Sequence, residues 1–107
     1  MRKVTQQIVK AFLNGESKKI GNSEVYGVTL ENGTRVITLQ LHGNDIASRV
    51  NGELKITNAG WFSNTTKERL NGLPDVSISQ KKGVWYLNGI EWNGNWIVVD
   101  ADYNTIV

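Results

Sequence analysis

The sequence predicts an α+β fold, in which an N-terminal amphipathic helix and a short second helix accompany an antiparallel sheet of β-hairpins. Asn-Gly occurs six times in the 107 residues, and this dipeptide suits the two positive-φ positions of a type I′ hairpin turn. Apolar residues at positions 8, 9, 12 and 13 recur with the helical period. A chain of this length has room for one hydrophobic core, so residues 1–107 are expected to form a single domain.

The first element is predicted to be a helix that begins at Thr5. Thr5 is the expected N-cap, and Val4 is placed to pack on Val9 as a hydrophobic staple. Asn14-Gly15 is expected to end the helix with glycine in the left-handed conformation. The apolar face of this helix consists of Ile8, Val9, Phe12 and Leu13.

Three of the Asn-Gly pairs separate strand-like segments and predict hairpins with a defined register. A two-residue turn at Asn32-Gly33 pairs Val28 with Ile37 and Tyr26 with Leu39. The same counting around Asn51-Gly52 pairs Arg49 with Leu54 and Ala47 with Ile56. Around Asn88-Gly89 it pairs Leu87 with Ile90 and places Trp85 opposite Trp92.

The second helix is predicted to open at Thr65, because Thr65 and Glu68 have the spacing of a capping box. Asn71-Gly72, followed by Pro74, is expected to close it. Strands are predicted after it at residues 76–79, 84–87, 90–92 and 96–99, as an antiparallel meander. The predicted order is a helix, about four strands, a short helix and about four more strands.

Composition excludes several kinds of site. The chain has no cysteine, so it cannot form a disulfide, a thiolate nucleophile or a cysteine-ligated metal centre. One histidine and scattered carboxylates match no zinc or calcium pattern, and Asp100 and Asp102 are interpreted as a solvated end. No phosphate-binding glycine motif occurs. We therefore expect no cofactor and no metal.

A catalytic interpretation would depend on His42, the one side chain with an unperturbed pKa near neutrality. Asp45 could orient it, with Ser48 or Thr38 as nucleophile, but no triad-bearing motif accompanies these residues. A lone histidine at the end of a strand is more often a turn or surface residue. The sequence therefore favours a protein that is not an enzyme.

Binding of single-stranded nucleic acid is the first alternative. Lys81 and Lys82 precede Trp85, and Trp61 precedes a helix that carries Lys67 and Arg69. Cations beside aromatic rings are typical of surfaces on which bases stack. The competing interpretation places Trp85, Trp92 and Trp96 in the core of a small sheet, and we expect at least two of the four tryptophans to be buried.

A protein-binding surface is the second alternative, because tryptophan, tyrosine and arginine dominate binding hot spots. Indoles that do not fit inside so small a fold would form an aromatic patch, and the edges of a hairpin-rich sheet could pair with a strand of a partner. The candidate binding residues are Trp61, Lys67, Arg69, Lys81, Lys82, Trp85 and Trp92.

Four segments of the chain form a recognisable pattern: Ala11-Phe12, Gly21-Asn22, Leu41-His42-Gly43-Asn44-Asp45-Ile46-Ala47 and Ala59-Gly60-Trp61-Phe62-Ser63-Asn64-Thr65-Thr66-Lys67-Glu68-Arg69-Leu70-Asn71. In these segments the chain resembles small accessory proteins carried by tailed phages and prophages. The resemblance covers about the first two thirds of the chain, and the tryptophan-rich end follows it more loosely. The resemblance implies a phage origin and implies no biochemical activity.

Taken together, these observations favour a phage protein that binds and occludes a host protein without catalysis. The specific hypothesis is an inhibitor of a nucleic-acid-targeting defence complex, in the manner of anti-CRISPR proteins. The sequence shows neither an apolar leader nor a membrane-spanning run, so the cytoplasm of the host cell is the expected location. The partner is expected to be a host protein or a protein–nucleic-acid complex, with direct nucleic-acid binding as the alternative.

Overall fold

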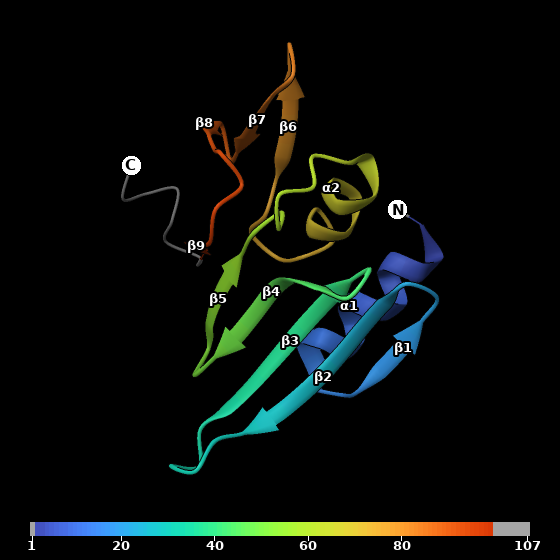
Figure 1. Ribbon diagram of the computed structural model, residues 1–107, viewed down its shortest axis with the longest axis vertical. Helices are drawn as coiled ribbons and strands as arrows, with labels where there is room; N and C mark the ends of the chain where they lie inside the picture. The colour runs from blue at the N-terminus through green and yellow to red at the C-terminus, as the bar shows by residue number, and fades with distance from the viewer. Residues whose placement is uncertain (1, 100–107) are drawn as a thin grey trace.

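The structure, a computed structural model, describes residues 2–99 and has an α+β architecture (Figure 1). This confirms the predicted fold class. Most of the elements are strands, and each of their pairings is antiparallel. Along the chain the elements are α1 (Lys3–Asn14), β1 (Lys18–Ile20), β2 (Ser23–Thr29), β3 (Arg35–Leu41), β4 (Asn44–Val50), β5 (Glu53–Ile56), α2 (Asn64–Leu70), β6 (Ile78–Lys81), β7 (Val84–Leu87), β8 (Ile90–Glu91) and β9 (Ile97–Val99).

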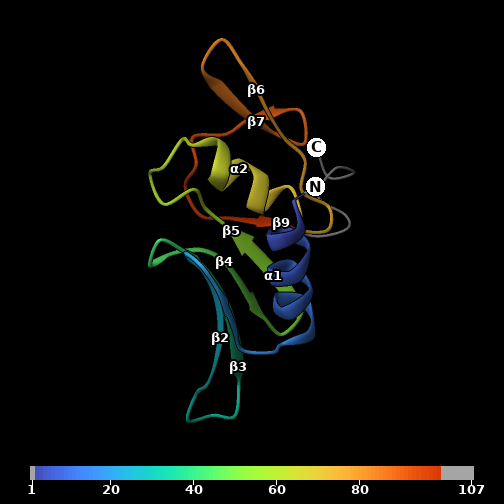
Figure 2. The same cartoon turned by 90° about the vertical axis from the view of Figure 1, so that its right-hand side faces the viewer.

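The strands form two sheets. The larger has the order β1-β2-β3-β4-β5-β9, and the smaller has the order β6-β7-β8. Figure 2 shows α1 against one face of the larger sheet, and α2 between that sheet and the β6–β7 hairpin. The short α2 is therefore the element that connects the two sheets.

The apolar side chains of both sheets and both helices meet in one continuous core. Phe12 of α1, Leu39 of β3, Leu70 of α2 and Leu87 of β7 are each fully buried within it. The helix face predicted from the sequence is confirmed for Ile8, Val9 and Phe12, which are buried, while Leu13 packs at the edge of the core. Gly15 adopts φ +72° and caps α1, as predicted.

A β-bulge shapes the end of the β3–β4 hairpin. The register shifts between Leu39, which pairs with Ala47, and Gln40, which pairs with Asp45. Ile46 is therefore the extra residue in β4, and a bulge of this kind turns a side chain away from the regular alternation. Ile46 and Ala47 are consecutive and both buried. Ile46 thereby reaches the space beneath α2.

The predicted register of the β2–β3 hairpin was wrong by one residue. Gly27, not Val28, pairs with Ile37, and Val25, not Tyr26, pairs with Leu39. The loop contains an additional residue, because the Leu30 N–H donates to the Thr34 carbonyl at 2.7 Å and Gly33 adopts φ +87°. Since side chains alternate between faces, this slip leaves Val28 exposed instead of buried.

Both predicted helix starts were also wrong. α1 begins at Lys3, and Thr5 lies inside it as a buried residue. Ser63 caps α2, where its side-chain oxygen accepts a hydrogen bond from the Thr66 N–H at 3.1 Å. Glu68 does not return to Thr65 and instead contacts α1. For α1, tertiary contacts of Thr5 with Glu68 and Arg69 outweigh the local capping pattern. For α2, a local cap two residues earlier takes the place of the predicted one.

The other two hairpin registers are confirmed. Ala47 pairs with Ile56 across the Asn51-Gly52 turn. Leu87 pairs with Ile90, and the Trp92 N–H donates to the Trp85 carbonyl at 3.0 Å. The predicted C-terminal meander was wrong at its end, because β9 pairs with β5 of the larger sheet. The strand predicted at 76–79 lies at Ile78–Lys81.

Candidate functional site

Large aromatic side chains are exposed on two loops. Trp61 and Phe62, in the loop between β5 and α2, are 58% and 56% exposed, and Trp96, just before β9, is 50% exposed. Large apolar side chains at this exposure are candidates for contact with a partner. We call the surface formed by Trp61, Phe62 and Trp96 the aromatic face.

A tight turn presents Trp61 to solvent. Ala59 and Gly60 have positive φ angles of 55° and 85°. The Trp61 N–H donates to the Asn58 carbonyl at 2.8 Å, and the Gly60 N–H donates to Asn58 Oδ1 at the same distance. These bonds hold the backbone on both sides of the turn, so the indole is displayed from an ordered loop.

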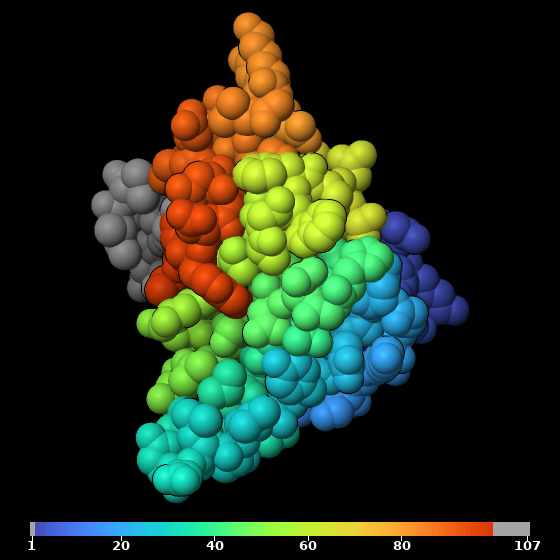
Figure 3. Space-filling view, in the orientation of Figure 1, coloured from blue at the N-terminus to red at the C-terminus, as the bar shows by residue number. Residues whose placement is uncertain are grey.

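The two aromatic loops lie side by side. The Asn58 N–H donates to the Gly94 carbonyl at 3.0 Å, and Thr57 Oγ1 donates to the same oxygen at 2.6 Å. A Cβ atom at Gly94 would overlap the Asn58 side chain, so the close approach requires glycine there. Figure 3 shows these two segments, yellow-green and red, adjacent on one face of the molecule.

Trp61 also forms a wall of a groove, which we call the Trp61 groove. Its volume is about 490 Å³, and it lies between the end of the β3–β4 hairpin and the start of α2. Buried Leu41 and Ile46 supply its apolar part, and hydroxyl and amide groups supply polar positions. The lining residues are Leu41, His42, Asn44, Ile46, Trp61, Ser63, Thr65 and Thr66.

His42 lies at this groove, in the β3–β4 turn with φ +53°. Its Nε2 atom is 3.0 Å from Asn22 Nδ2. Asp45 does not orient it, because Asp45 Oδ1 accepts a hydrogen bond from Gln40 Nε2 at 2.7 Å. The histidine is thus tied to the loop before β2 and is available at the groove as a polar contact.

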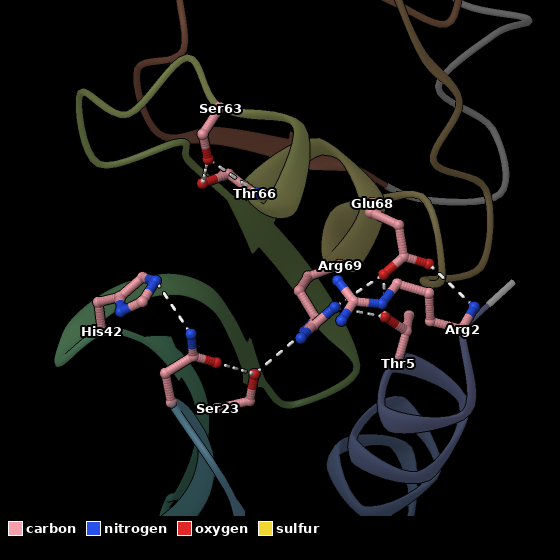
Figure 4. A network of polar contacts seen from close by, with 9 residues as sticks. Arg2, Thr5, Ser23, His42, Ser63, Thr66, Glu68 and Arg69 are labelled. Atoms are coloured by element: carbon pink, nitrogen blue, oxygen red, sulfur yellow. Dashed lines mark hydrogen bonds and ion pairs between the residues drawn. The ribbon is translucent and has the colours of Figure 1, made fainter.

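Behind the groove, buried Arg69 joins α2 to α1 and β2 (Figure 4). Its Nε donates to Ser23 Oγ at 3.0 Å, and its Nη1 donates to Thr5 Oγ1 and to Glu68 Oε1, both at 2.7 Å. The Thr5 hydroxyl in turn donates to Glu68. The network holds the orientation of α2, which carries one wall of the groove.

Glu68 is the acidic member of this network. Partial burial by itself raises the pKa of a carboxyl group. Hydrogen bonds from the Thr5 hydroxyl and the Arg2 backbone N–H, together with the Arg69 charge, outweigh that effect, so the pKa of Glu68 is lowered below its ordinary value. The ionised form of Glu68 is therefore the one that the fold stabilises.

The arginine predicted as a binding residue is thus an interior residue, with 3% of its surface exposed. The sequence analysis chose Arg69 because it lies on the helix that follows Trp61, as a cation close to an aromatic ring. The packing of α2 against α1 and β2 instead turns the guanidinium group inward, where Thr5, Ser23 and Glu68 occupy it. Arg69 positions α2 and is not available to a partner.

Trp85 and Trp92 are also interior, with 1% and 6% exposed, which confirms that at least two tryptophans are buried. Their ring centroids are 6.3 Å apart. Phe62 packs edge-on against Trp85 at 5.2 Å, and Lys67 Nζ lies 5.9 Å from the Trp85 ring. No face of either indole is open to a stacking base. Neither ring can therefore serve as the stacking surface that the nucleic-acid hypothesis requires.

Lys81 and Lys82 are exposed at the tip of the β6–β7 hairpin, which projects from the molecule in Figures 1 and 3. Lys67 lies beneath them on α2, where its Nζ donates to Gln80 Oε1 at 2.9 Å. The structure therefore separates the seven predicted residues. Lys81 and Lys82 form an exposed basic tip, Trp61 is exposed, Lys67 lies near the Trp85 ring, and the interior residues are Arg69, Trp85 and Trp92.

The model of the Kyanoviridae Gp96 protein family matches residues 1–105. The chain belongs to this family. Kyanoviridae Gp96 is a phage protein family, which confirms the predicted phage origin. No curated protein and no solved structure matches the chain.

Two further findings concern the part of this Gp96 family member that the structure describes. Neither helix within residues 2–99 has the length and apolar character needed to cross a membrane. The same residues contain no group of three or more histidine, aspartate or glutamate side chains that could hold a metal ion. Asp100 and Asp102, interpreted above as a solvated end, lie outside the described residues.

The Trp61 groove itself was not predicted. Sequence reasoning identified Trp61 and noted His42, but had no signal that Leu41, Ile46 and the start of α2 would meet them. The bulge in β4 brings these residues together, because it directs the Ile46 side chain inward. A bulge at this position carries no glycine or other marker in the local sequence.

Proposed function

We propose that this phage protein binds a host protein through the aromatic face and the Trp61 groove, and acts by occluding the bound surface without catalysis. The observation that carries the proposal is the 58% exposure of Trp61 beside a groove of about 490 Å³. An exposed, ordered indole next to an apolar recess is the usual composition of a binding hot spot.

The chemistry of the groove describes the segment of the partner that fits. Leu41, Ile46 and Trp61 favour an aliphatic or aromatic side chain, whose transfer from water is stabilising. His42 and Asn44, at the β3–β4 turn, can hydrogen-bond the backbone that carries that side chain. The expected ligand is therefore an apolar side chain presented on a polar loop or strand of the host protein.

Phage family membership supports a host target. Within that class, we propose a nucleic-acid-targeting defence complex, by analogy with anti-CRISPR proteins, which work by covering a surface of such complexes. Burial of Trp85 and Trp92 favours contact with the protein component over direct stacking on nucleic acid.

The test combines capture and inhibition. The full chain is immobilised, incubated with host lysate, and compared with Trp61→Ala, which removes the exposed indole while retaining the backbone bonds of the turn. Loss of a hot-spot tryptophan costs about 2 kcal/mol or more, or about thirtyfold in affinity. Leu30→Ala is the matched control, since Leu30 is an exposed apolar residue at the β2–β3 loop.

The captured host protein is then assayed for its own activity, with plasmid interference as the readout for a defence nuclease. We expect wild type and Leu30→Ala to inhibit and Trp61→Ala to lose inhibition. Equal capture by all three proteins would show that the aromatic face is not the binding surface. Capture without any loss of the host protein's activity would contradict occlusion.

A further inference from the structure

A second pocket lies at the C-terminal end of α1 and shares no residue with the Trp61 groove. Its volume is about 410 Å³. Two of its lining residues, Arg35 and Arg49, are cationic, and none is acidic. The lining residues are Asn14, Gly15, Arg35, Ile37, Arg49, Asn51 and Gly52.

The two arginines are neighbours on one face of the larger sheet. Arg49 of β4 pairs with Ile37 of β3, and Arg35 lies two residues before Ile37 on the same strand. Such diagonal neighbours have backbones about 7–8 Å apart, within reach of long side chains. Both arginines line the same pocket, so an anion bound in it would lie near both side chains.

Arg35 is held in place by β2 and retains free donors. Its Nη1 atom donates to Thr29 Oγ1 at 3.1 Å. A Cβ atom at Gly27 would overlap the Arg35 guanidinium, so the missing side chain at this strand position makes room for it. A glycine in a strand interior weakens the strand unless it permits such an approach.

Arg49 carries an unsatisfied donor. Its guanidinium carbon lies 5.6 Å from the centroid of the Phe12 ring. Its Nε atom is buried and has no hydrogen-bond partner within residues 2–99. A buried donor without an acceptor is costly. Because Nε is enclosed, an anion in the pocket would compensate the Arg49 charge and would not contact Nε itself.

The charges near the pocket favour an anion. The ion pairs of the described residues join Lys55 to Glu53 and Arg69 to Glu68, so neither Arg35 nor Arg49 has a carboxylate partner there. The C-terminus of α1 contributes roughly half a negative charge. Two guanidinium charges exceed that, and no lining residue is acidic, so the lining of the pocket is net positive.

We propose that this pocket binds a phosphate dianion, either free or as the terminal group of a small phosphomonoester. A phosphomonoester carries a charge of about −1.5 to −2 at neutral pH, which matches the two arginines, and the guanidinium fork suits phosphate oxygens. Asn14 and Asn51 offer amide groups to an attached organic part. The proposal does not depend on host-protein binding.

The test is isothermal titration calorimetry on the full chain at low salt, with inorganic phosphate, adenosine 5′-monophosphate and adenosine as probes. Both phosphate-bearing probes are expected to bind and adenosine is not. Tighter binding of the monophosphate identifies a phosphomonoester as the ligand, and equal binding identifies the free ion. Amide resonances of Asn14, Gly15, Asn51 and Gly52 should shift on binding.

Arg49→Gln and Arg35→Gln should each weaken phosphate binding about tenfold or more, because each removes a charge-assisted hydrogen bond. Lys55→Gln is the matched control: it removes one positive charge on β5 outside the pocket lining. Because Arg49 contacts Phe12, a thermal melt of each variant accompanies the titration. Arg35 has an exposed side chain, so Arg35→Gln tests the site with little effect on folding.

Three outcomes would overturn the proposal. The first is the absence of phosphate binding by the wild-type protein. The second is an equal loss of affinity in Lys55→Gln and Arg35→Gln, which would indicate attraction to net charge alone. The third is unchanged affinity in both folded arginine variants.

Discussion

At the scale of single residues, some polar side chains stabilise the fold from buried positions that the local sequence does not indicate. Arg69 and Thr5 are both buried, and each is satisfied by the other and by Glu68. Burying a guanidinium group is costly unless its donors find acceptors. Arg69 therefore depends on contacts from α1 and β2, and α2 is held in place by the same contacts.

The lowered pKa of Glu68 predicts a pH-dependent contribution to stability. A carboxyl group with a lowered folded-state pKa stabilises the fold above its unfolded pKa, about 4.3, and loses that contribution as pH falls through the folded value. Glu68→Gln should therefore lower the free energy of unfolding by about 1–2 kcal/mol at pH 7. The difference from wild type should shrink below about pH 4.

Urea denaturation at pH 7, 5, 4 and 3 measures this difference. Glu53→Gln is the control, because Glu53 is half exposed and its ion pair with Lys55 contributes little. A gap between wild type and Glu68→Gln that stays constant down to pH 3 would show that the ionised carboxylate is not the stabilising form.

At the scale of elements, glycine at the second turn position predicts hairpins better than the complete Asn-Gly dipeptide. His42-Gly43 and Lys82-Gly83 adopt the same pair of positive φ angles as Asn51-Gly52 and Asn88-Gly89. Asn32-Gly33 has the complete dipeptide, yet its loop is one residue longer than a type I′ turn. Local turn chemistry indicates where the chain reverses, but packing of Val25 and Leu39 selects the register.

Gly94 connects two loops and offers a test at this scale. Gly94 adopts φ +90° and a Cβ atom there would overlap the Asn58 side chain, whereas Gly33, with φ +87°, has open space around it. Gly33→Ala should cost about 1 kcal/mol from backbone conformation alone. Gly94→Ala should cost a further 1–2 kcal/mol, roughly, because Asn58 must move.

Urea denaturation measures the free energy of unfolding of both variants. Because the backbone penalty is common to both, the difference between them reports the contact between Gly94 and Asn58. Gly94→Ala should also change the environment of Trp61, visible in its indole NMR resonance, because Asn58 supports the Trp61 turn. Equal destabilisation by both substitutions, with an unchanged Trp61 resonance, would mean that the contact between the loops does not hold the aromatic face.

At the scale of the whole molecule, the two sheets share one core. Trp85 and Leu87 of the smaller sheet belong to the same buried cluster as Ile8 and Phe12 of α1. In addition, the chain returns from the smaller sheet to add β9 beside β5. The single domain predicted from chain length therefore implies cooperative unfolding.

This prediction can be measured with two probes in one protein. In a Trp61→Phe, Trp96→Phe variant, fluorescence reports on the buried Trp85 and Trp92 of the β7–β8 region, while far-ultraviolet circular dichroism reports on all the elements. We expect the same denaturation midpoint from both. Two separate midpoints would instead identify the β6–β8 region as an independent unit.

The sequence determined the elements of this protein, because each depends on residues that are close in the chain. The apolar face of α1, the glycine cap at Gly15 and the turns at Asn51-Gly52 and Asn88-Gly89 are local properties, and each was predicted. Two buried tryptophans were also predicted, because the chain has few phenylalanine and methionine residues to fill the core of a small sheet.

Only the tertiary structure decided which surfaces the protein offers. The inward turn of Arg69, the bulge that directs Ile46 toward Trp61, and the diagonal placement of Arg35 and Arg49 arise from contacts between distant segments. The free energy of such contacts comes from packing and from satisfied polar groups. No short stretch of sequence contains both partners, so only the folded chain brings these side chains together.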